Sequence, residues 1–180
     1  MSHLWVLTYM SIRGEINRHI GRKLFHLPPL IPSDPLVREL FVSAEVLEIA
    51  KEPFAEHRDG IRHAQFRNYL DAFTSGEEIG VSEKPFNKRY DTFLARVHPP
   101  QIEVWDIRAI EPRPGIRSFG CFGDRDLFIA LTYEYRENLD ETEDGFAAEA
   151  RRCRKVWDSL FSSAPHRGSV SDLLTNFYIG

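Results

Sequence analysis

The segment from Ile102 to Asn138 constrains the fold more than any other part of the chain. It holds three strand patterns in a row: IEVWDIRAI, GIRSFGCF and DLFIALTYEY. The second and third are separated by a Gly-Asp turn sequence, and strands joined by such tight turns pair antiparallel. The segment therefore predicts the centre of a β-sheet.

The third of these patterns is apolar on both of its faces. Strict alternation places the following residues on one face: Leu127, Ile129, Leu131, Tyr133 and Tyr135. The opposite face carries Phe128 and Ala130. A strand that is covered on both sides has this composition, so we expect it near the middle of the sheet.

A helix with one apolar face follows the three strands. Its apolar residues recur at spacings of four, three, four and three: Phe146, Ala150, Cys153, Trp157 and Leu160. That period is typical of an amphipathic helix. Four cations lie on or beside the other face: Arg151, Arg152, Arg154 and Lys155.

The region before the three strands predicts a short strand and two helices. VRELFV is the strand candidate, and Ser43 follows it as the N-cap of a helix that Pro53 ends near Glu52. A second apolar face runs from Ile61 to Thr74, so the two helices form a hairpin joined around Asp59 and Gly60. A further short helix is expected between Lys88 and Val97.

The length of 180 residues predicts one domain with tails. Residues 1–35 include LPPLIPSDP and have no convincing periodic apolar face, so we interpret them as an N-terminal extension and proline-rich linker. Residues 36–162 form the domain. Residues 163–180 form a C-terminal tail that ends in LLTNFYIG.

Composition excludes several classes of protein. No segment has the roughly 18 to 20 apolar residues that span a bilayer, and no secretory signal is evident, so we expect no membrane association. The two cysteines are not spaced as metal ligands and do not form a disulfide framework, so we expect reduced thiols in the core. Reduced thiols favour a cytoplasmic location. The chain lacks the motifs of common hydrolases, P-loop proteins and zinc enzymes, so we expect neither a metal nor a cofactor.

Arginines and tyrosines interrupt or end the three strands: Arg108, Arg117, Tyr133, Tyr135 and Arg136. Guanidinium groups bind phosphate oxygens in a bidentate manner, so this set can hold and polarise a phosphodiester without a metal. The alternative is structural. The two strand arginines can pair with Asp106, Glu103 or Glu134, and the tyrosines can be core or rim aromatics.

The order of these elements and motifs resembles the RelE superfamily of bacterial toxins, in particular the HigB or phage Gp49-like branch. The matching motifs, in chain order, are LFVSAEVLEIA, EVWDIR, GIRSFGCF, IALTYEYREN and FAAEARRCRKV. They span residues 36–162. The resemblance implies an α+β fold in which a helical hairpin and a C-terminal helix pack on a small, mainly antiparallel sheet.

The same resemblance implies a function and a set of site residues. The chain would be the toxin of a type II toxin–antitoxin system, a metal-free endoribonuclease that cleaves mRNA on the ribosome and binds a cognate antitoxin. Arg117, Arg136, Tyr133 and Tyr135 would be catalytic, with His166 as a further proton-transfer candidate. The RNA-binding residues would be Arg108, Arg151 and Arg154.

Two features depart from the family pattern and leave alternatives open. The net charge is −4, and Glu134 and Glu137 flank Arg136, which disfavours RNA phosphate. A non-catalytic RelE/ParE-like protein that blocks a topoisomerase, or a degenerate toxin, fits this charge. A third alternative is an unrelated α+β interaction domain whose C-terminal tail docks onto a partner.

Overall fold

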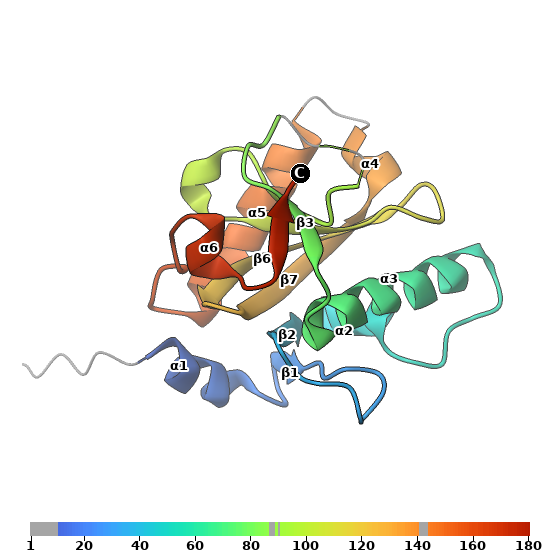
Figure 1. Cartoon of the computed structure of the whole chain (residues 1–180), viewed down its shortest axis with the longest axis horizontal. Helices are drawn as coiled ribbons and strands as arrows, with labels where there is room; N and C mark the ends of the chain where they lie inside the picture. Colours follow the sequence, from blue (N-terminus) through green and yellow to red (C-terminus); the bar gives the residue numbers. More distant parts are fainter. Residues whose placement is uncertain (1–10, 87–88, 90, 141–143) are drawn as a thin grey trace, which may run out of the picture.

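The protein is an α+β structure built on one mixed β-sheet (Figure 1). The computed structural model describes residues 11–86, 89, 91–140 and 144–180. Within them, the sheet has eight strands in the order β1-β2-β7-β6-β5-β4-β3-β8. The strands are β1 (Leu24–His26), β2 (Glu39–Ser43), β3 (Ile79–Ser82), β4 (Leu94–Arg96), β5 (Trp105–Ala109), β6 (Ile116–Asp124), β7 (Leu127–Tyr135) and β8 (Phe177–Ile179).

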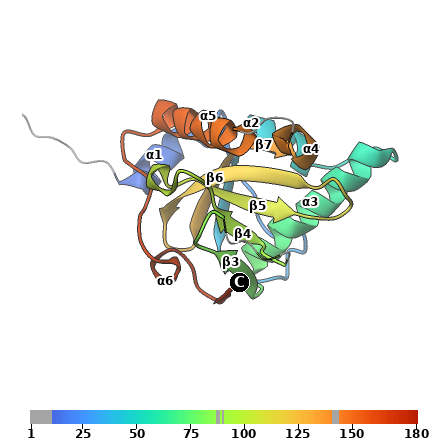
Figure 2. The same ribbon diagram turned by 90° about the horizontal axis from the view of Figure 1, so that it is seen from above.

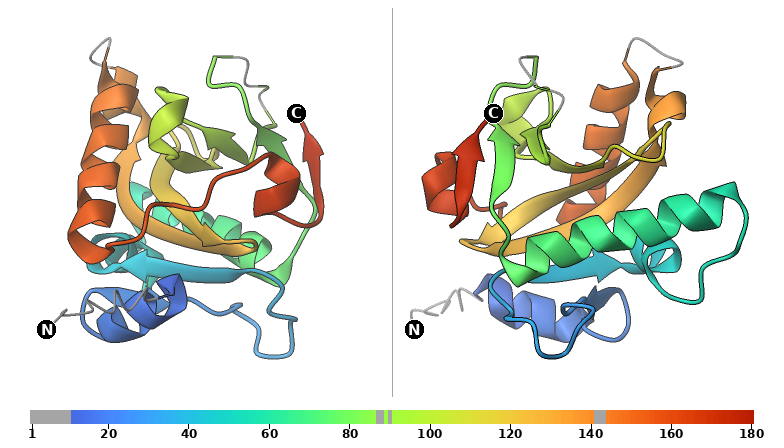
Figure 3. Two further views of the ribbon diagram at one scale, coloured as in Figure 1. Left: turned by 90° about the vertical axis from the view of Figure 1, so that its left-hand side faces the viewer. Right: turned by 45° about the vertical axis from the view of Figure 1, so that its right-hand side comes forward.

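Helices cover both faces of this sheet. They are α1 (Ile12–His19), α2 (Ala44–Ala50), α3 (Arg58–Ser75), α4 (Arg136–Asp140), α5 (Gly145–Leu160) and α6 (Val170–Leu173), with a 3-10 turn η1 (Pro100–Ile102). One core lies between the sheet and α2, α3 and α6, and the other lies between the sheet and α1 and α5. Figures 2 and 3 show α5 and α6 on opposite sides of the sheet. None of the helices in the described part of the chain combines the length and apolar character needed to cross a bilayer.

The predicted central strands and the basic helix are confirmed. The three strand patterns form β5, β6 and β7, and these pair antiparallel in sequence order. VRELFV supplies β2, which lies parallel to β7 and places β7 inside the sheet. The periodic segment that follows forms α5, whose Ala150, Cys153 and Trp157 are buried.

The prediction that five residues of β7 share one face is wrong. Leu127, Ile129 and Leu131 pack in the core under α5, whereas Tyr133 and Tyr135 pack against the core on the α2–α3 side. The register shifts beside Gly120, so the strand alternation reverses after Leu131. A β-bulge of this kind places an extra residue in one strand, and every later side chain then changes face.

The sheet is larger than predicted, because short segments without a sequence pattern extend both edges. Strand β1 adds to β2, while β4, β3 and β8 follow β5. Among the strands that the structure describes, three of the seven pairings are parallel, so the sheet is mixed. The prediction of a helix between Lys88 and Val97 is wrong for the end of that segment, since Leu94–Arg96 forms β4. Lys88 itself lies outside the described residues.

The C-terminal tail, which the sequence leaves open as a segment that docks onto a partner, is packed in the sheet of its own chain. Strand β8 pairs parallel with β3. Arg38, which is fully buried, holds the tail in place because it donates hydrogen bonds to the carbonyl oxygens of Thr175 and Asn176 at 2.7 and 2.8 Å. The same guanidinium donates to the carbonyls of Phe73 and Glu77, at the end of α3.

Residues 11–35, which the sequence places in the extension and linker, contribute α1 and β1 to the fold. Glu15 on α1 is buried and accepts hydrogen bonds from the backbone N–H groups of Ser162 and Ser163 at 2.7 and 3.3 Å. The Ser162 hydroxyl also donates to it. Burial alone would raise the pKa of this carboxyl, but these hydrogen bonds outweigh it and hold the pKa below its ordinary value. Residues 1–10 lie outside the described part of the chain.

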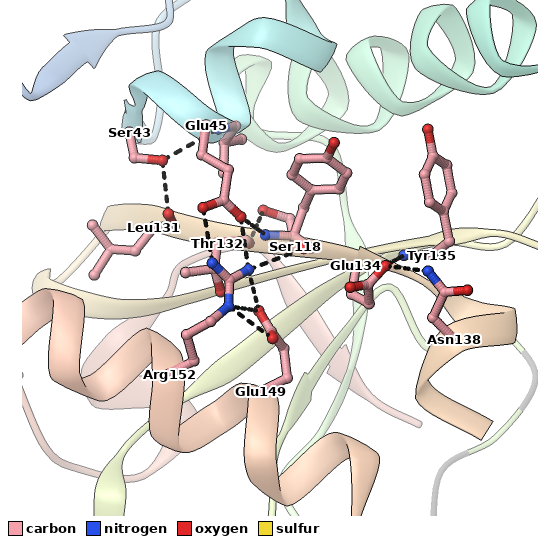
Figure 4. A network of polar contacts seen from close by, with 12 residues as sticks. Ser43, Glu45, Ser118, Leu131, Thr132, Glu134, Tyr135, Asn138, Glu149 and Arg152 are labelled. Carbon is pink, nitrogen blue, oxygen red and sulfur yellow. Dashed lines mark hydrogen bonds and ion pairs between the residues drawn. The ribbon is translucent and has the colours of Figure 1, made fainter. Parts of the chain in front are cut away.

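Side chains complete the hydrogen bonding of β7 where β2 ends (Figure 4). The Ser43 hydroxyl donates to the Leu131 carbonyl at 2.7 Å and also caps α2, as predicted. Beyond it, Glu45 accepts from the Tyr133 N–H, and Arg152 donates to the Tyr133 carbonyl. Arg152 is itself paired with Glu45 at 2.7 Å, so α2 and α5 are joined across the strand from opposite faces of the sheet.

Candidate functional site

Two arginines from neighbouring strands and a third from the start of α4 meet on the α5 face of the sheet. Arg108 on β5 and Arg117 on β6 are direct cross-strand partners. Arg136 follows the last residue of β7, and its backbone N–H donates to the Gly115 carbonyl at 2.8 Å, which fixes it beside the start of β6. Antiparallel pairing thus brings together residues that are up to 28 positions apart in sequence.

These three side chains line two adjoining hollows. One has a volume of about 370 Å³ and is also lined by Phe86, His98, Asp106 and Phe146 among others. The other, of about 530 Å³, opens toward the loop that contains Arg113 and Pro114. Because all three arginines line both hollows, we treat them as one depression, the arginine pocket.

Arg117 forms the floor of the arginine pocket. It is only 5% exposed, and its Nε lies 3.6 Å from Oδ2 of the fully buried Asp106. Burial is the largest cause that lowers the pKa of Arg117; Asp106 opposes it, the charges of Arg108 and Arg136 add to it, and the resulting pKa is about 10. The guanidinium therefore remains protonated at neutral pH.

Arg108 and Arg136 are half-buried at the sides of the arginine pocket. Arg108 Nη1 donates to the carbonyls of Arg89 and Thr92, each at 3.1 Å, which orients its guanidinium. Arg136 pairs with Asp140, and its Cζ lies 4.8 Å from the centre of the Phe146 ring. Burial, followed by the charge of Arg108, lowers the pKa of Arg136. Three like charges are thus held close together.

The two glutamates that flank Arg136 in sequence already accept hydrogen bonds from other groups. Glu137 forms a two-pronged pair with Arg62 on α3, at 2.9 and 3.1 Å. Glu134 lies opposite Arg117 in the register of β6 and β7, and its carboxylate accepts hydrogen bonds from the Asn138 side chain and the Tyr135 backbone N–H. Their carboxylates therefore compete less with a bound anion than their positions in the sequence suggest.

The two tyrosines predicted to be catalytic lie away from the arginine pocket, because both pack against the core on the α2–α3 side of the sheet. Figure 4 shows Tyr135 on the side of β7 opposite to Arg152 of α5. The Tyr135 hydroxyl lies 2.8 Å from Nε2 of His63, and the Arg62 guanidinium stacks on its ring. Burial is the largest cause that raises the pKa of both Tyr133 and Tyr135, so a smaller fraction of each phenol is ionised at neutral pH and able to accept a proton.

The remaining predicted residues are also apart from the three arginines. Arg154 pairs with Asp158 at 2.9 Å and donates to the Ile102 carbonyl, so its guanidinium fastens α5 to η1. Arg151 is exposed on α5, outside the described lining of the pocket. His166 lines a separate hollow beside Ser11 and Asp124.

Sequence reasoning named Asp106 as a possible partner of the strand arginines, and Arg117 does pair with it, but it missed two other residues that line the arginine pocket, His98 and Phe146. The sequence pattern places Asp106 near the arginines, because it shares a strand face with Arg108 two residues away. No sequence pattern places His98, since it lies in a loop whose path is set by the sheet. Its ring centre is 4.9 Å from that of Phe86.

The arginine pocket is suited to an anion with several oxygens. Guanidinium groups present N–H donors in a planar fork that matches phosphate, and partial burial strengthens such bonds relative to water. In the described ranges, no three His, Cys, Asp or Glu side chains are grouped as metal ligands. Asp106 and Asp140 each offset one of the three positive charges, so one positive charge of the three arginines remains without a paired carboxylate.

Comparisons with known proteins identify no relative of this chain: no protein-family model matches it, and neither a curated protein nor a solved structure gives a significant match.

Proposed function

We propose that the chain is a RelE-like toxin of a type II toxin–antitoxin system, and that it cleaves mRNA on the ribosome without a metal by binding the scissile phosphate in the arginine pocket. The observation that carries this proposal is the convergence of Arg108, Arg117 and Arg136 in one partly buried depression. The sequence predicts phosphate binding for each of these three arginines.

The element order gives further support. A strand leads directly into two helices, and three antiparallel strands and a helix follow, with the first strand parallel to the last: β2, α2, α3, β5, β6, β7 and α5. This is the order that the RelE resemblance implies. The strands β1, β3, β4 and β8 are additions to it.

Cleavage would proceed by internal transesterification. The 2′-hydroxyl attacks the adjacent phosphorus and loses its proton, while the bond to the 5′-oxygen breaks and that oxygen gains a proton. The products are a 2′,3′-cyclic phosphate and a 5′-hydroxyl. The arginines stabilise the charge that develops on the phosphorane oxygens. His98 lines the same depression, and imidazole is suited to proton transfer near neutral pH.

Induced expression tests this function in cells. We expect growth and translation to stop, and full-length mRNA to be replaced by fragments. Arg136→Ala should relieve the arrest, because it removes a pocket charge from a half-buried position with little risk to the fold. Arg125→Ala is the matched control, since it removes an exposed arginine at the other end of the same β6–β7 hairpin. Arrest by both variants, or by neither, would contradict the assignment of the site.

A non-catalytic binding protein of the same fold is the second candidate. It is favoured by the position of Tyr133 and Tyr135, which removes two predicted proton-transfer groups from the arginine pocket. In that case the protein would arrest growth while mRNA remains intact, and Arg136→Ala would still relieve the arrest.

A further inference from the structure

A second pair of hollows continues from the arginine pocket around the end of β5. Ile110 lines both the larger hollow of the arginine pocket and a neighbouring hollow of about 220 Å³. Tyr69 and Phe93 line this neighbour and also a further hollow of about 330 Å³. The lining therefore passes from the arginine pocket on the α5 face, by way of Ile110 just after β5, to two aromatic rings on the α3 side of the sheet.

Tyr69 and Phe93 form a stacked aromatic pair at the surface. Their ring centres are 5.5 Å apart with an angle of 29° between the rings, and both side chains are half-buried. Tyr69 comes from α3, and Phe93 immediately precedes β4, so two separate elements hold the pair in a fixed position.

The polar side chains differ between the arginine pocket and the two aromatic hollows. Arginines line the arginine pocket, whereas Asp91 and Glu111 line the smaller aromatic hollow. These two carboxylates pair with Arg89 and Arg113, respectively. Gln65 and Asn68 line the larger aromatic hollow. Carboxylates repel a phosphate but accept hydrogen bonds from the amino groups of a nucleobase, and amides can bond to either kind of base edge.

We infer that the stacked pair of Tyr69 and Phe93 is a nucleobase subsite, which binds a base of the RNA strand whose phosphate occupies the arginine pocket. This inference rests on the proposed function, since it assigns the neighbouring nucleotide of the same strand. Aromatic side chains bind bases of single strands by stacking, and this accounts for aromatic rings beside a phosphate site. The hollows are at or below the lower end of ligand-pocket volumes, as suits a single base.

The test is the affinity for a short single-stranded RNA, compared with a strand of the same length in which the bases are absent. Both strands carry 2′-O-methyl groups to prevent cleavage and a terminal dye for fluorescence anisotropy. Tyr69→Leu should weaken binding of the RNA by about 5- to 100-fold and leave binding of the abasic strand unchanged. Tyr69→Phe, which preserves the ring, should bind both strands as the unaltered protein does.

Arg136→Ala separates this inference from the proposed function, because it should weaken binding of both strands. If Tyr69→Leu weakens neither strand, or both equally, the subsite is refuted while the effect of Arg136→Ala still supports the phosphate site. If Tyr69→Leu unfolds the chain, Phe93→Leu is measured in its place with the same expectation. Failure of the unaltered protein to bind either strand would overturn both proposals.

Discussion

Arg108 and Arg117 face each other as direct partners across β5 and β6. Like charges in such positions destabilise an antiparallel pair. The nearby Asp106 offsets one of the two charges, and Arg136, which pairs with Asp140, adds a third arginine at the side of the same depression. Proteins violate the rules of stable packing mainly at functional sites, so this arrangement is the strongest structural reason to place the function here.

Anion binding should relieve the repulsion among these arginines. We expect inorganic phosphate to raise the melting temperature, because a ligand that binds only the folded state stabilises it by about 2.7 kcal/mol at a concentration 100 times its Kd. Arg108→Gln should weaken phosphate binding about tenfold through loss of one charged hydrogen bond. Differential scanning fluorimetry over a phosphate titration measures both effects. An equal loss in Arg125→Gln would show that phosphate acts on the general surface charge.

The buried ion pair on the pocket floor should be essential for stability. Asp106→Asn leaves the Arg117 guanidinium, itself 5% exposed, without its carboxylate partner. Loss of one member of a buried pair costs about 3 to 5 kcal/mol, which urea unfolding can measure. Asp140→Asn is the control, because its pair with Arg136 is largely exposed and should contribute at most about 1 kcal/mol. Equal stabilities of the two variants would refute this role for Asp106.

Arg38 should hold the C-terminal tail in the sheet. Its replacement by Met keeps much of the buried volume but leaves the carbonyls of Phe73, Thr175 and Asn176 without this donor. Unsatisfied buried groups cost about 1 to 3 kcal/mol each, so we expect a loss of more than about 2 kcal/mol and faster amide exchange in β8. Arg13→Met, at an exposed pair with Glu39, is the control. Protected β8 amides in Arg38→Met would contradict the anchor.

Glu15 should make the attachment of α1 dependent on pH. The pKa of its carboxyl is lowered in the folded state, so its stabilising contribution is full above the ordinary value of 4.5 and is lost as pH falls through the lower folded value. Glu15→Gln should therefore be less stable than the unaltered protein at neutral pH, with the difference shrinking in acid. Urea unfolding from about pH 7 to pH 3 measures it. Glu48→Gln, at a largely exposed residue, should show no such trend.

The sequence predicts the elements whose pattern is long enough to specify one face. The strands β5, β6 and β7 and the helix α5 each show their period over at least five residues. Strands β1, β3, β4 and β8 have three or four residues each, which is too short for any alternation to be visible. Their pairing comes from tertiary contacts, such as those of Arg38 with the tail.

The candidate site was predictable where hairpin pairing decides the geometry. Arg108, Arg117 and Arg136 meet because antiparallel neighbours align across short turns. The sequence could not place Tyr133 and Tyr135 on the correct face. One extra residue in β7, opposite Phe119 and Gly120 of β6, reverses the alternation of side chains along β7, and no sequence pattern marks it. His98 and Phe86 come from loops, whose paths depend on the whole fold.

Cleavage of mRNA bound to ribosomes tests the central claim most directly. With a chelator present, we expect the purified protein to produce 2′,3′-cyclic phosphate and 5′-hydroxyl ends. A 2′-deoxynucleotide at the cleaved position should prevent the reaction. Arg136→Ala should slow it by about 10²- to 10³-fold, the usual effect of losing one group that stabilises transition-state charge. Cleavage of the 2′-deoxy strand, or equal rates for Arg136→Ala and Arg125→Ala, would contradict the account.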